Sequence, residues 1–407
     1  MSAWEYLTQI TRWPHRGSTS AYEREAAQWI GSTLGRLGYR VEIQPFLAPA
    51  ATLYAGPPLV SLVIASVTLG ALWAGSPWAR TLAAAVSLAA AALLVQEASL
   101  SRPAFDLILP RRPSQNVIAE PLPARRDMAQ QPEQGTPTVV VTAHYDTQRA
   151  SWLFAPWFRP VLPLFFKAAY GALGLTLASL LAGALAGWWA PAWEPWRWGA
   201  WVGLTLVAVL MGFLALAGLF GRPVNGANDN GSGTAVALAL AERWAAHPPE
   251  GVRLRFLFTG AEEAGTRGMW AYLRTPGAQE PSYIVNIDNV GGGRLRALLN
   301  EGMLLPIPCG RRMRRTAERL AAGGQLSLWS RMLLLSTDAG PAAMHRHEVL
   351  TFIGLDEGGN IPNYHWFSDM IQHVHRQHLE DVCGTVGAFV EMLACDLRSP
   401  ALSRVGG

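Results

Sequence analysis

Four long apolar runs constrain what this chain can fold into. They fall in two blocks, at 53–95 and 157–220, and each run is close to or above the roughly 20 residues that a helix needs to cross a bilayer. Only a short linker joins the two runs of each block. The pattern predicts two transmembrane hairpins, at 52–98 and 157–220. The alternative, four buried core helices, fits less well because such long, nearly uncharged runs exceed what one soluble core accommodates.

The rest of the chain alternates strand-like and helix-like segments. Apolar segments typical of strands lie at 39–46, 114–120, 137–144, 252–258, 283–288 and 348–354. Amphipathic or apolar helical segments separate several of them, such as 233–247 and 378–397. This alternation predicts an α/β fold with a mixed, mostly parallel sheet that helices cover on both faces.

The apolar blocks divide this α/β part without destroying it. A hairpin returns the chain to the side that it left, so the soluble pieces can form one discontinuous domain. We expect that domain to comprise 1–47, 111–152 and 222–400, and to be followed by a tail at 401–407. The arginines close to the spans lie mainly on the domain side, at 102, 111, 112, 149, 159 and 222, whereas the hairpin turns hold only Arg80 and Arg197. The protein is therefore expected to be a multi-pass membrane protein whose domain faces the cytoplasm.

Composition argues against two other classes of site. The net charge of +4 comes almost entirely from arginine, and the densest basic run, at 311–315, has no interleaved aromatic residues. We interpret this run as a solvated helix face and expect no nucleic-acid partner. The three cysteines lack CxxC spacing, so neither a disulfide framework nor a cysteine-based zinc site is indicated.

Polar motifs follow several of the predicted strands. They are "HYD" at 144–146, "GANDNGSG" at 226–233, "GAEEAG" at 260–265, "NIDN" at 286–289 and "YHWFSD" at 364–369. Each has an ordinary interpretation by itself, as a helix cap or a surface loop. Together they supply two imidazoles and several carboxylates beyond strand ends of one sheet, where α/β proteins build their sites.

This set of side chains suits zinc, which accepts nitrogen and oxygen ligands and leaves positions open for water and substrate. Two ions about 3.5–4 Å apart can share a bridging carboxylate and activate a water molecule. One carboxylate must then stay off the metals as the general base. The adjacent pair Glu262 and Glu263 offers one residue for each task.

The ordered motifs resemble those of the dinuclear zinc aminopeptidases of metallopeptidase family 28, over nearly the whole soluble part of the chain. The resemblance implies two Zn²⁺ ions. It places His144 and Asp288 on one ion, Glu263 and His365 on the other, and Asp229 as the bridge between them.

The same resemblance implies roles for three further residues. Glu262 is the expected general base, Asp146 the partner that orients His144, and Tyr364 the hydrogen-bond donor to the developing oxyanion. The chain departs from the family's pattern after Asp338, where Ala339 replaces the usual histidine, so that no role is assigned to Asp338. Five more histidines lie near the last motif but off its register and are expected to be structural or exposed: His345, His347, His373, His375 and His378.

The function that these inferences predict is a membrane-bound zinc exopeptidase of aminopeptidase type. It would hydrolyse the N-terminal peptide bond of a substrate with a zinc-activated water and the Glu262 base. Glutaminyl cyclases, carboxypeptidases and other amidohydrolases share this architecture and stay open as alternatives. A non-catalytic membrane scaffold with a peptidase-like domain is the alternative of another class. The sequence does not define the oligomeric state.

The position of the insertions adds an expectation about the substrate. The first hairpin interrupts the connection between the first two strands, and the second separates "HYD" from "GANDNGSG". Both should leave the domain on the side of the site. The site is then expected to face the lipid bilayer and to admit hydrophobic or membrane-derived peptides.

Overall fold

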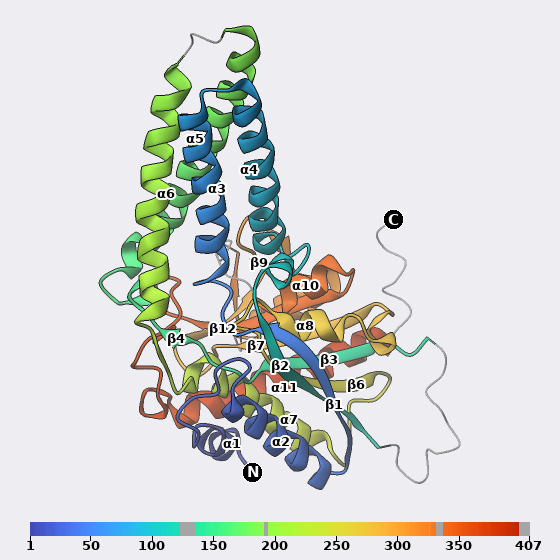
Figure 1. The fold of residues 1–407 in the computed structure, drawn as a ribbon. Coiled ribbons are helices and arrows are strands. Elements are labelled where there is room, and N and C mark those ends of the chain that lie inside the picture. Colours follow the sequence, from blue (N-terminus) through green and yellow to red (C-terminus); the bar gives the residue numbers. More distant parts are fainter. Residues whose placement is uncertain (123–134, 191–193, 325, 331–336, 399–407) are drawn as a thin grey trace.

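The computed structural model describes residues 1–122, 135–190, 194–324, 326–330 and 337–398. The expected tail at 401–407 lies outside these residues. An eight-stranded sheet has the order β1-β2-β6-β3-β7-β12-β8-β11 (Figure 1). Its strands are β1 (Tyr39–Pro49), β2 (Arg111–Pro121), β3 (Thr138–His144), β6 (Arg253–Thr259), β7 (Ser282–Asp288), β8 (Arg294–Leu298), β11 (Ser327–Trp329) and β12 (Glu348–Leu355).

The sheet is mixed, and its centre is parallel. β3 pairs in parallel with both β6 and β7, and β7 pairs in parallel with β12. The antiparallel pairs are β1 with β2, β2 with β6, and β12 with β8, while β11 pairs in parallel with β8. The carboxyl ends of the four central parallel strands therefore meet at one edge, as the sequence predicts.

Helices cover both faces because the central strands are apolar on both sides. In β3, Val139 and Val141 belong to the core beneath one layer of helices, and Val140 belongs to the core on the opposite face. The first layer comprises α1 (Ala3–Ile10), α2 (Ala21–Arg36), α7 (Gly233–Trp244), α9 (Arg311–Ala322) and α11 (Arg376–Arg398). The second comprises α8 (Arg267–Tyr272) and α10 (Ala339–Met344).

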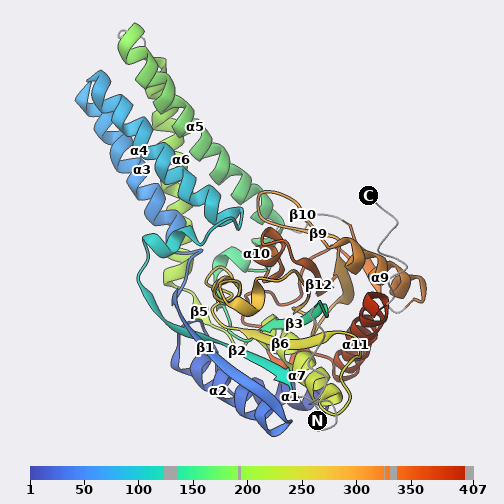
Figure 2. The same cartoon turned by 90° about the vertical axis from the view of Figure 1, so that its right-hand side faces the viewer.

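Four long helices stand together as a bundle at one end of this domain (Figures 1 and 2). They are α3 (Gly56–Ala74), α4 (Pro77–Ala98), α5 (Leu162–Trp189) and α6 (Pro195–Leu219). In the bundle α3 contacts α4 and α6, and α5 contacts α4 and α6. All four are long and apolar enough to cross a membrane. The α3–α4 hairpin lies between β1 and β2, and the α5–α6 hairpin lies between β3 and α7.

Both hairpins leave the domain at the edge where β3 ends. β2 is antiparallel to β6, so its first residues, which pair with the end of β1, lie at the carboxyl end of β6. At the second hairpin, β4 (Arg149–Ala150) and β5 (Arg222–Pro223) form a short antiparallel ladder that brings the chain together again after the insertion. The spatial relation expected between hairpins and sheet edge is therefore present.

The outer edge of the sheet was not predicted from the sequence. β8 and β11 were not predicted, nor was the short pair β9 (Asn300–Glu301) and β10 (Ile307–Pro308). β8 contains two arginines in five residues, and β11 has only three residues. Segments so short and polar carry little periodic signal, and pairing with neighbouring strands determines their structure.

Candidate metal centre

The predicted ligand residues converge at the carboxyl edge of the parallel strands. His144 is the last residue of β3, and Asp288 is the last residue of β7. Glu263 follows β6, Asp229 precedes α7, and His365 lies in the loop before α11. Parallel strands end at a common edge, so residues up to 221 positions apart in sequence, from 144 to 365, lie close together in space.

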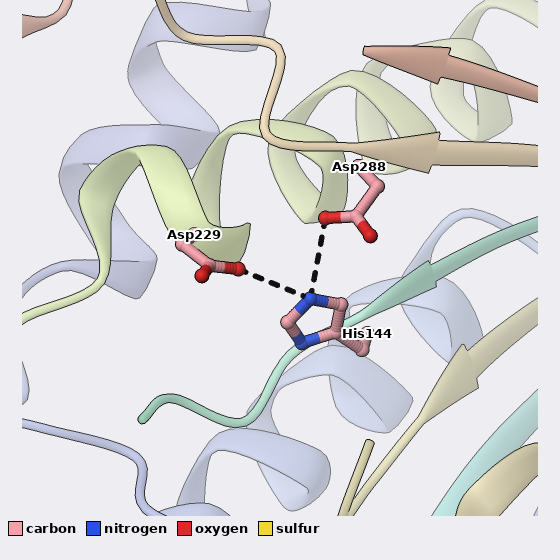
Figure 3. A group of neighbouring side chains, drawn as sticks. All are labelled: His144, Asp229 and Asp288. Carbon is pink, nitrogen blue, oxygen red and sulfur yellow. Dashed lines mark ion pairs between the residues drawn. The ribbon is translucent and has the colours of Figure 1, made fainter. Parts of the chain in front are cut away.

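The five side chains form two groups that share Asp229. In the first group the Nε2 atom of His144 lies 3.3 Å from Oδ1 of Asp229 and 3.4 Å from Oδ1 of Asp288 (Figure 3). In the second, Nε2 of His365 lies 2.9 Å from Oδ2 of Asp229 and 3.2 Å from Oε1 of Glu263. Asp229 thus presents one carboxylate oxygen to each group, which is the arrangement of a bridging ligand.

Several of these atoms are close together without forming hydrogen bonds. Oδ2 of Asp229, Oε1 of Glu263 and both ring nitrogens of His365 are buried and have no hydrogen-bond partner among the described residues. An unpaired buried polar atom costs about 1–3 kcal/mol. Nitrogen and carboxylate oxygen atoms that converge in this way fit a bound divalent cation, and zinc is the ion that this mixture of donors suits best.

The electrostatics of the site lead to the same conclusion. Burial lowers the pKa of both histidines, yet nearby carboxylates raise the pKa of His144 well above its ordinary value and that of His365 to about 10. Burial raises the pKa of Glu262 well above its usual range, and that of Glu263 to about 7, against the opposing effect of the histidines. The polypeptide alone thus concentrates negative charge here, and a cation would neutralise it.

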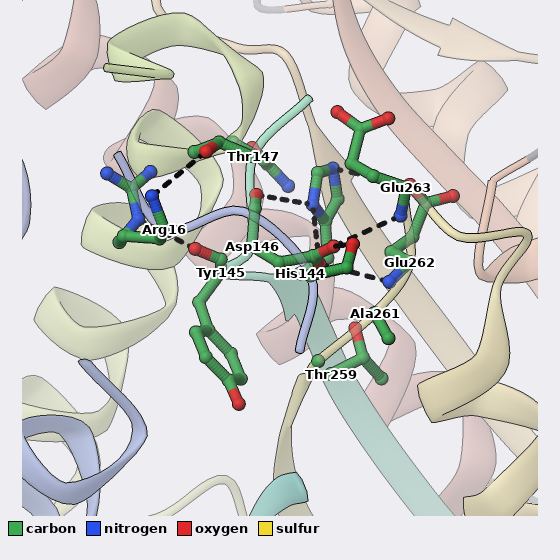
Figure 4. Close-up of polar contacts among 12 residues, drawn as sticks. Arg16, His144, Tyr145, Asp146, Thr147, Thr259, Ala261, Glu262 and Glu263 are labelled. Atoms are coloured by element: carbon green, nitrogen blue, oxygen red, sulfur yellow. Dashed lines mark hydrogen bonds and ion pairs between the residues drawn. The ribbon is translucent and has the colours of Figure 1, made fainter. Parts of the chain in front are cut away.

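Asp146 connects the first group to the loop that carries the two glutamates (Figure 4). Its Oδ1 lies 3.5 Å from Nδ1 of His144 and accepts a hydrogen bond from the backbone N–H of Glu262 (3.0 Å). Its Oδ2 accepts from the N–H of Glu263 (3.2 Å) and from the hydroxyl of Ser18 (2.6 Å). The predicted contact with His144 is present, and the contacts with the glutamate loop add a positioning role that the spacing did not reveal.

Two buried residues from the N-terminal segment, neither of them a predicted site residue, hold the loops. The guanidinium of Arg16 is fully buried and donates to the carbonyl oxygens of Tyr145 (2.7 Å), Asn225 (2.8 Å) and Gly226 (2.9 Å), so it ties the "HYD" loop to the "GANDNGSG" loop. The carboxylate of Glu23 accepts from the N–H of Ala261 (2.9 Å), next to the glutamate pair. Arg16 lies near no recognisable motif, and the sequence indicates only a helix capping box for Glu23 with Ser20, so only the fold shows that both residues hold these loops.

Side chains from two further motifs orient Asp229. Asp369, in the "YHWFSD" motif, accepts from the N–H groups of Asn228 (2.6 Å) and Asp229 (3.1 Å). The amide of Asn289 donates to Asp229 (3.1 Å) and to Asp288 (2.8 Å). Asn289 has a φ of 55° and His365 a φ of 49°, a left-handed conformation that is uncommon for residues other than glycine and gathers at functional sites.

Three other residues considered in the sequence belong to neither ligand group. Tyr364 stacks on His365 with ring centroids 3.7 Å apart. Asp338 is buried near the glutamate pair and accepts a hydrogen bond from the hydroxyl of Thr259. His347, as expected, has a structural contact, because its Nδ1 accepts from the N–H of Ser282 (3.1 Å).

A cavity begins at the metal groups. Gln148, Glu262, Glu263, Tyr364 and His365 line it, together with side chains of the four long helices and of the loops that adjoin them. Its volume is about 290 Å³. The candidate residues that line the cavity thus face a chamber that extends toward the helix bundle.

The fold is shared with solved zinc-dependent exopeptidases and glutaminyl cyclases. Residues 211–390 match the model of Peptidase family M28. That segment includes Asp229, Glu262, Glu263 and His365 and excludes His144. No curated protein sequence matches the chain significantly.

Solved structures with the same fold span nearly the whole chain. One is a Zn-dependent exopeptidase from Parabacteroides distasonis, with 13% identity, a TM-score of 0.53 and 95% of each chain covered. Another is a glutaminyl cyclase from Bacteroides thetaiotaomicron, with 15% identity, a TM-score of 0.54 and 96% of each chain covered. A third is an aminopeptidase from Aneurinibacillus, with 14% identity, a TM-score of 0.51, and 95% of this chain and 92% of the other covered. Together with the family match, these similarities support a hydrolase and leave its exact reaction open.

Proposed function

We propose that this chain is a zinc-dependent exopeptidase of the M28 type, anchored in a membrane by its two helical hairpins, that removes the N-terminal residue of a peptide or related amide. The observation that carries the proposal is the pair of buried ligand groups that share Asp229 beside Glu262. The ligand atoms of both groups converge, and those of the second group, around His365, have no hydrogen-bond partner among the described residues, as expected for atoms that bind zinc.

The ligands divide between two ions. His144, Asp229 and Asp288 would hold one zinc, and Asp229, Glu263 and His365 would hold the other. Zinc bound at such a site supplies a Lewis acid that polarises a carbonyl group and lowers the pKa of water.

The chain's own residues carry out the proton transfers. Glu262 lines the cavity, and its Oε2 lies 3.9 Å from Nε2 of His144, so its carboxylate lies next to the ligands without belonging to either group. There it would take the proton of the attacking water and return it to the leaving nitrogen. Burial raises its pKa well above the usual range, which favours holding that proton. Tyr364 lines the same cavity, and its hydroxyl would donate a hydrogen bond to the carbonyl oxygen of the substrate.

Membrane anchoring is supported by the surface of the bundle. Large apolar side chains on all four helices are strongly exposed, among them Leu62, Leu82, Leu164, Leu185 and Val209. A soluble protein rarely exposes so extensive an apolar surface. We further propose that the domain faces the cytoplasm, because arginines near the spans lie mainly on its side.

Replacement of Glu262 tests the mechanism. Glu262→Gln should lower turnover by about 10²–10⁴-fold, because the amide cannot accept the water's proton, while the zinc content measured by mass spectrometry stays at that of the wild type. Glu357→Gln, in an exposed loop, is the control and should change neither quantity. Activity close to that of wild type in a zinc-loaded Glu262→Gln protein would show that another residue is the base.

Substrate assays distinguish the competing functions. Aminoacyl-fluorophores, N-acyl-amino acids and peptides with N-terminal glutamine should be compared with the full chain in detergent. We expect hydrolysis of aminoacyl substrates, and cyclisation of glutaminyl peptides without hydrolysis would instead identify a cyclase. A chain that binds no zinc would be a scaffold, and the enzyme proposal would then fail.

A further inference from the structure

The cavity beside the metal groups extends into the interior of the helix bundle. Each of the four helices contributes residues of the half that adjoins the α/β domain: α3 through Ser61, α4 through Leu94, α5 through Phe165 and Leu173, and α6 through Val207 and Met211. The glutamate pair lines the opposite end of the same chamber. The cavity therefore joins polar, candidate catalytic groups to an apolar chamber between the helices.

The depth of this chamber follows from the residues of α5 that line it. They run from Leu162 to Leu173, a separation of 11 residues, which corresponds to about 16 Å along a helix axis. With a volume of about 290 Å³, a cavity of this length has room for one extended chain.

The polarity of the wall decides what kind of chain fits. Among the described lining residues, the helices contribute three polar side chains, Ser61, Glu97 and Tyr170, and Glu97 is already paired with Arg267 (2.8 Å). An extended peptide would place about five residues, with about ten backbone N–H and C=O groups, along 16 Å. Each group left without a partner costs about 1–3 kcal/mol. A hydrocarbon chain has no such groups and favours an apolar wall.

We propose that the substrate is an amide that carries a long hydrocarbon chain next to the bond that is cleaved, and that this chain lies in the cavity between the four helices. The proposal rests on the proposed amide hydrolysis and specifies its substrate class. The hydrocarbon could be attached on the amine side of the amide, as in an amino-acid alkylamide, or on its acyl side, as in an N-acyl amino acid. Both share the chemistry that the cavity recognises, and the experiment separates them.

The test compares chain lengths in the full-length protein in lipid nanodiscs. Alanine n-alkylamides and N-acyl-alanines with chains of two to twelve carbons form the two series. In one series kcat/KM should rise with chain length, and the series that responds identifies the side that carries the chain. If twelve-carbon substrates of both series react no faster than two-carbon ones, the proposal is wrong.

Variants of one helix separate the cavity from the lipid. Ala169 lines the cavity, whereas its neighbour Ala168 is exposed on the outside of α5. Ala169→Trp should lower kcat/KM for twelve-carbon substrates by about tenfold or more and that for two-carbon substrates by less than about twofold. Ala168→Trp should leave kcat/KM unchanged for both substrates. Because substrates partition into the lipid equally for the two variants, a difference between them reflects the cavity. Val207→Phe narrows the same cavity from α6 and should have the same effect as Ala169→Trp. Agreement between the two variants would show that the loss does not come from local misfolding of α5. An equal loss for short and long substrates would overturn the assignment.

A binding measurement keeps this inference separate from the proposed function. Radiolabelled dodecanoyl-alanine and alanine dodecylamide are titrated onto the Glu262→Gln protein in nanodiscs, with and without Ala169→Trp. We expect Ala169→Trp to raise the Kd of one of them by about tenfold or more. If the protein binds these ligands but the wild type turns over no substrate, the proposed hydrolase function is wrong and the proposed binding of a hydrocarbon chain in the cavity is retained. Turnover of short peptides without any effect of chain length or of Ala169→Trp would refute only the present inference.

Discussion

Asp146 connects two parts of the candidate site, the His144 side chain and the loop that carries Glu262 and Glu263. It lies two positions after His144 and accepts hydrogen bonds from the backbone of both Glu262 and Glu263. One side chain therefore fixes the orientation of an imidazole on β3 and the path of the loop after β6. Groups that orient metal ligands in this way change metal affinity without contacting the metal.

We expect Asp146→Asn to weaken zinc binding by about 10–100-fold, because an asparagine nitrogen would face an N–H donor where a carboxylate oxygen now accepts. Competition with a zinc chelator measures this affinity. Asp338→Asn is the matched control, since Asp338 is also buried at this edge but contacts Thr259 and not the backbone of the glutamate loop. Equal zinc affinity in wild type and Asp146→Asn would remove Asp146 from its positioning role.

At the scale of the elements, ion pairs join the first hairpin to the start of α8, which directly follows the loop with Glu262 and Glu263. Arg267, at the start of α8, contacts Glu97 at the end of α4 (2.8 Å) and Asp106 in η1 (Ala104–Leu107) (2.6 Å). It also donates to the carbonyl of Gly265 (2.6 Å), two residues after Glu263. The guanidinium is almost fully buried. The helix bundle is thereby connected to the loop that carries the proposed base.

Arg267→Met should destabilise the protein by roughly 3–5 kcal/mol, because it leaves the largely buried carboxylates of Glu97 and Asp106 without the cation that pairs with them. Chemical unfolding in detergent measures the loss. Arg243→Met, which breaks the half-exposed pair of Arg243 with Glu391, should cost less than about 1 kcal/mol. Similar losses in both variants would mean that the pairs around Arg267 are no more important than a surface pair.

Small residues let the long helices approach one another. A Cβ atom at Gly183 of α5 would come within 2.5 Å of the ring of Trp196 on α6, whereas a Cβ at Gly174 of the same helix would meet no atom within 4 Å. The first glycine lies in a helix contact and the second does not.

Gly183→Leu should therefore destabilise the bundle by about 1–3 kcal/mol through overpacking. Gly174→Leu should be neutral or slightly stabilising, because leucine favours helix more than glycine does. The thermal unfolding midpoint of each variant in detergent measures the difference. If both substitutions lower it equally, the loss reflects leucine itself and not the contact with Trp196.

At the scale of the whole molecule, the bundle and the α/β domain should occupy different environments. Cys395 is exposed on α11 of the domain, and Ala74 is exposed at the end of α3, next to the turn of the first hairpin. If the hairpin crosses the bilayer, these two positions lie on opposite sides of it.

A membrane-impermeant maleimide should label Ala74→Cys, in a Cys395→Ser background, in sealed vesicles that expose the outer face. The native Cys395 should be labelled only after the vesicles are opened, because we place the domain in the cytoplasm. Labelling of both positions from the same side would contradict a membrane-crossing hairpin. The reverse pattern would keep the hairpin and invert its orientation.

The helices and strands with the strongest periodic or compositional patterns were predicted correctly from the sequence. The apolar runs correspond to α3–α6, and the buried runs that end in His144 and Asp288 are the central strands β3 and β7. Such segments are recognised because apolar side chains recur at every helical turn or along the whole of a buried strand. β8 and β11 were missed because they are short and partly polar, and their neighbours in the sheet hold them.

The sequence by itself determined which residues are candidates for the metal centre, because ligand chemistry belongs to the residue type and strand ends can be read from the chain. Only the tertiary structure decided how they meet: that Asp229 presents one oxygen to each histidine, and that Arg16 and Glu23 hold the loops from the N-terminal segment. It also decided that the cavity beside Glu262 continues between the four helices. These relations join residues from distant parts of the chain, and spacing along a sequence carries no information about distances that strand order and helix packing create.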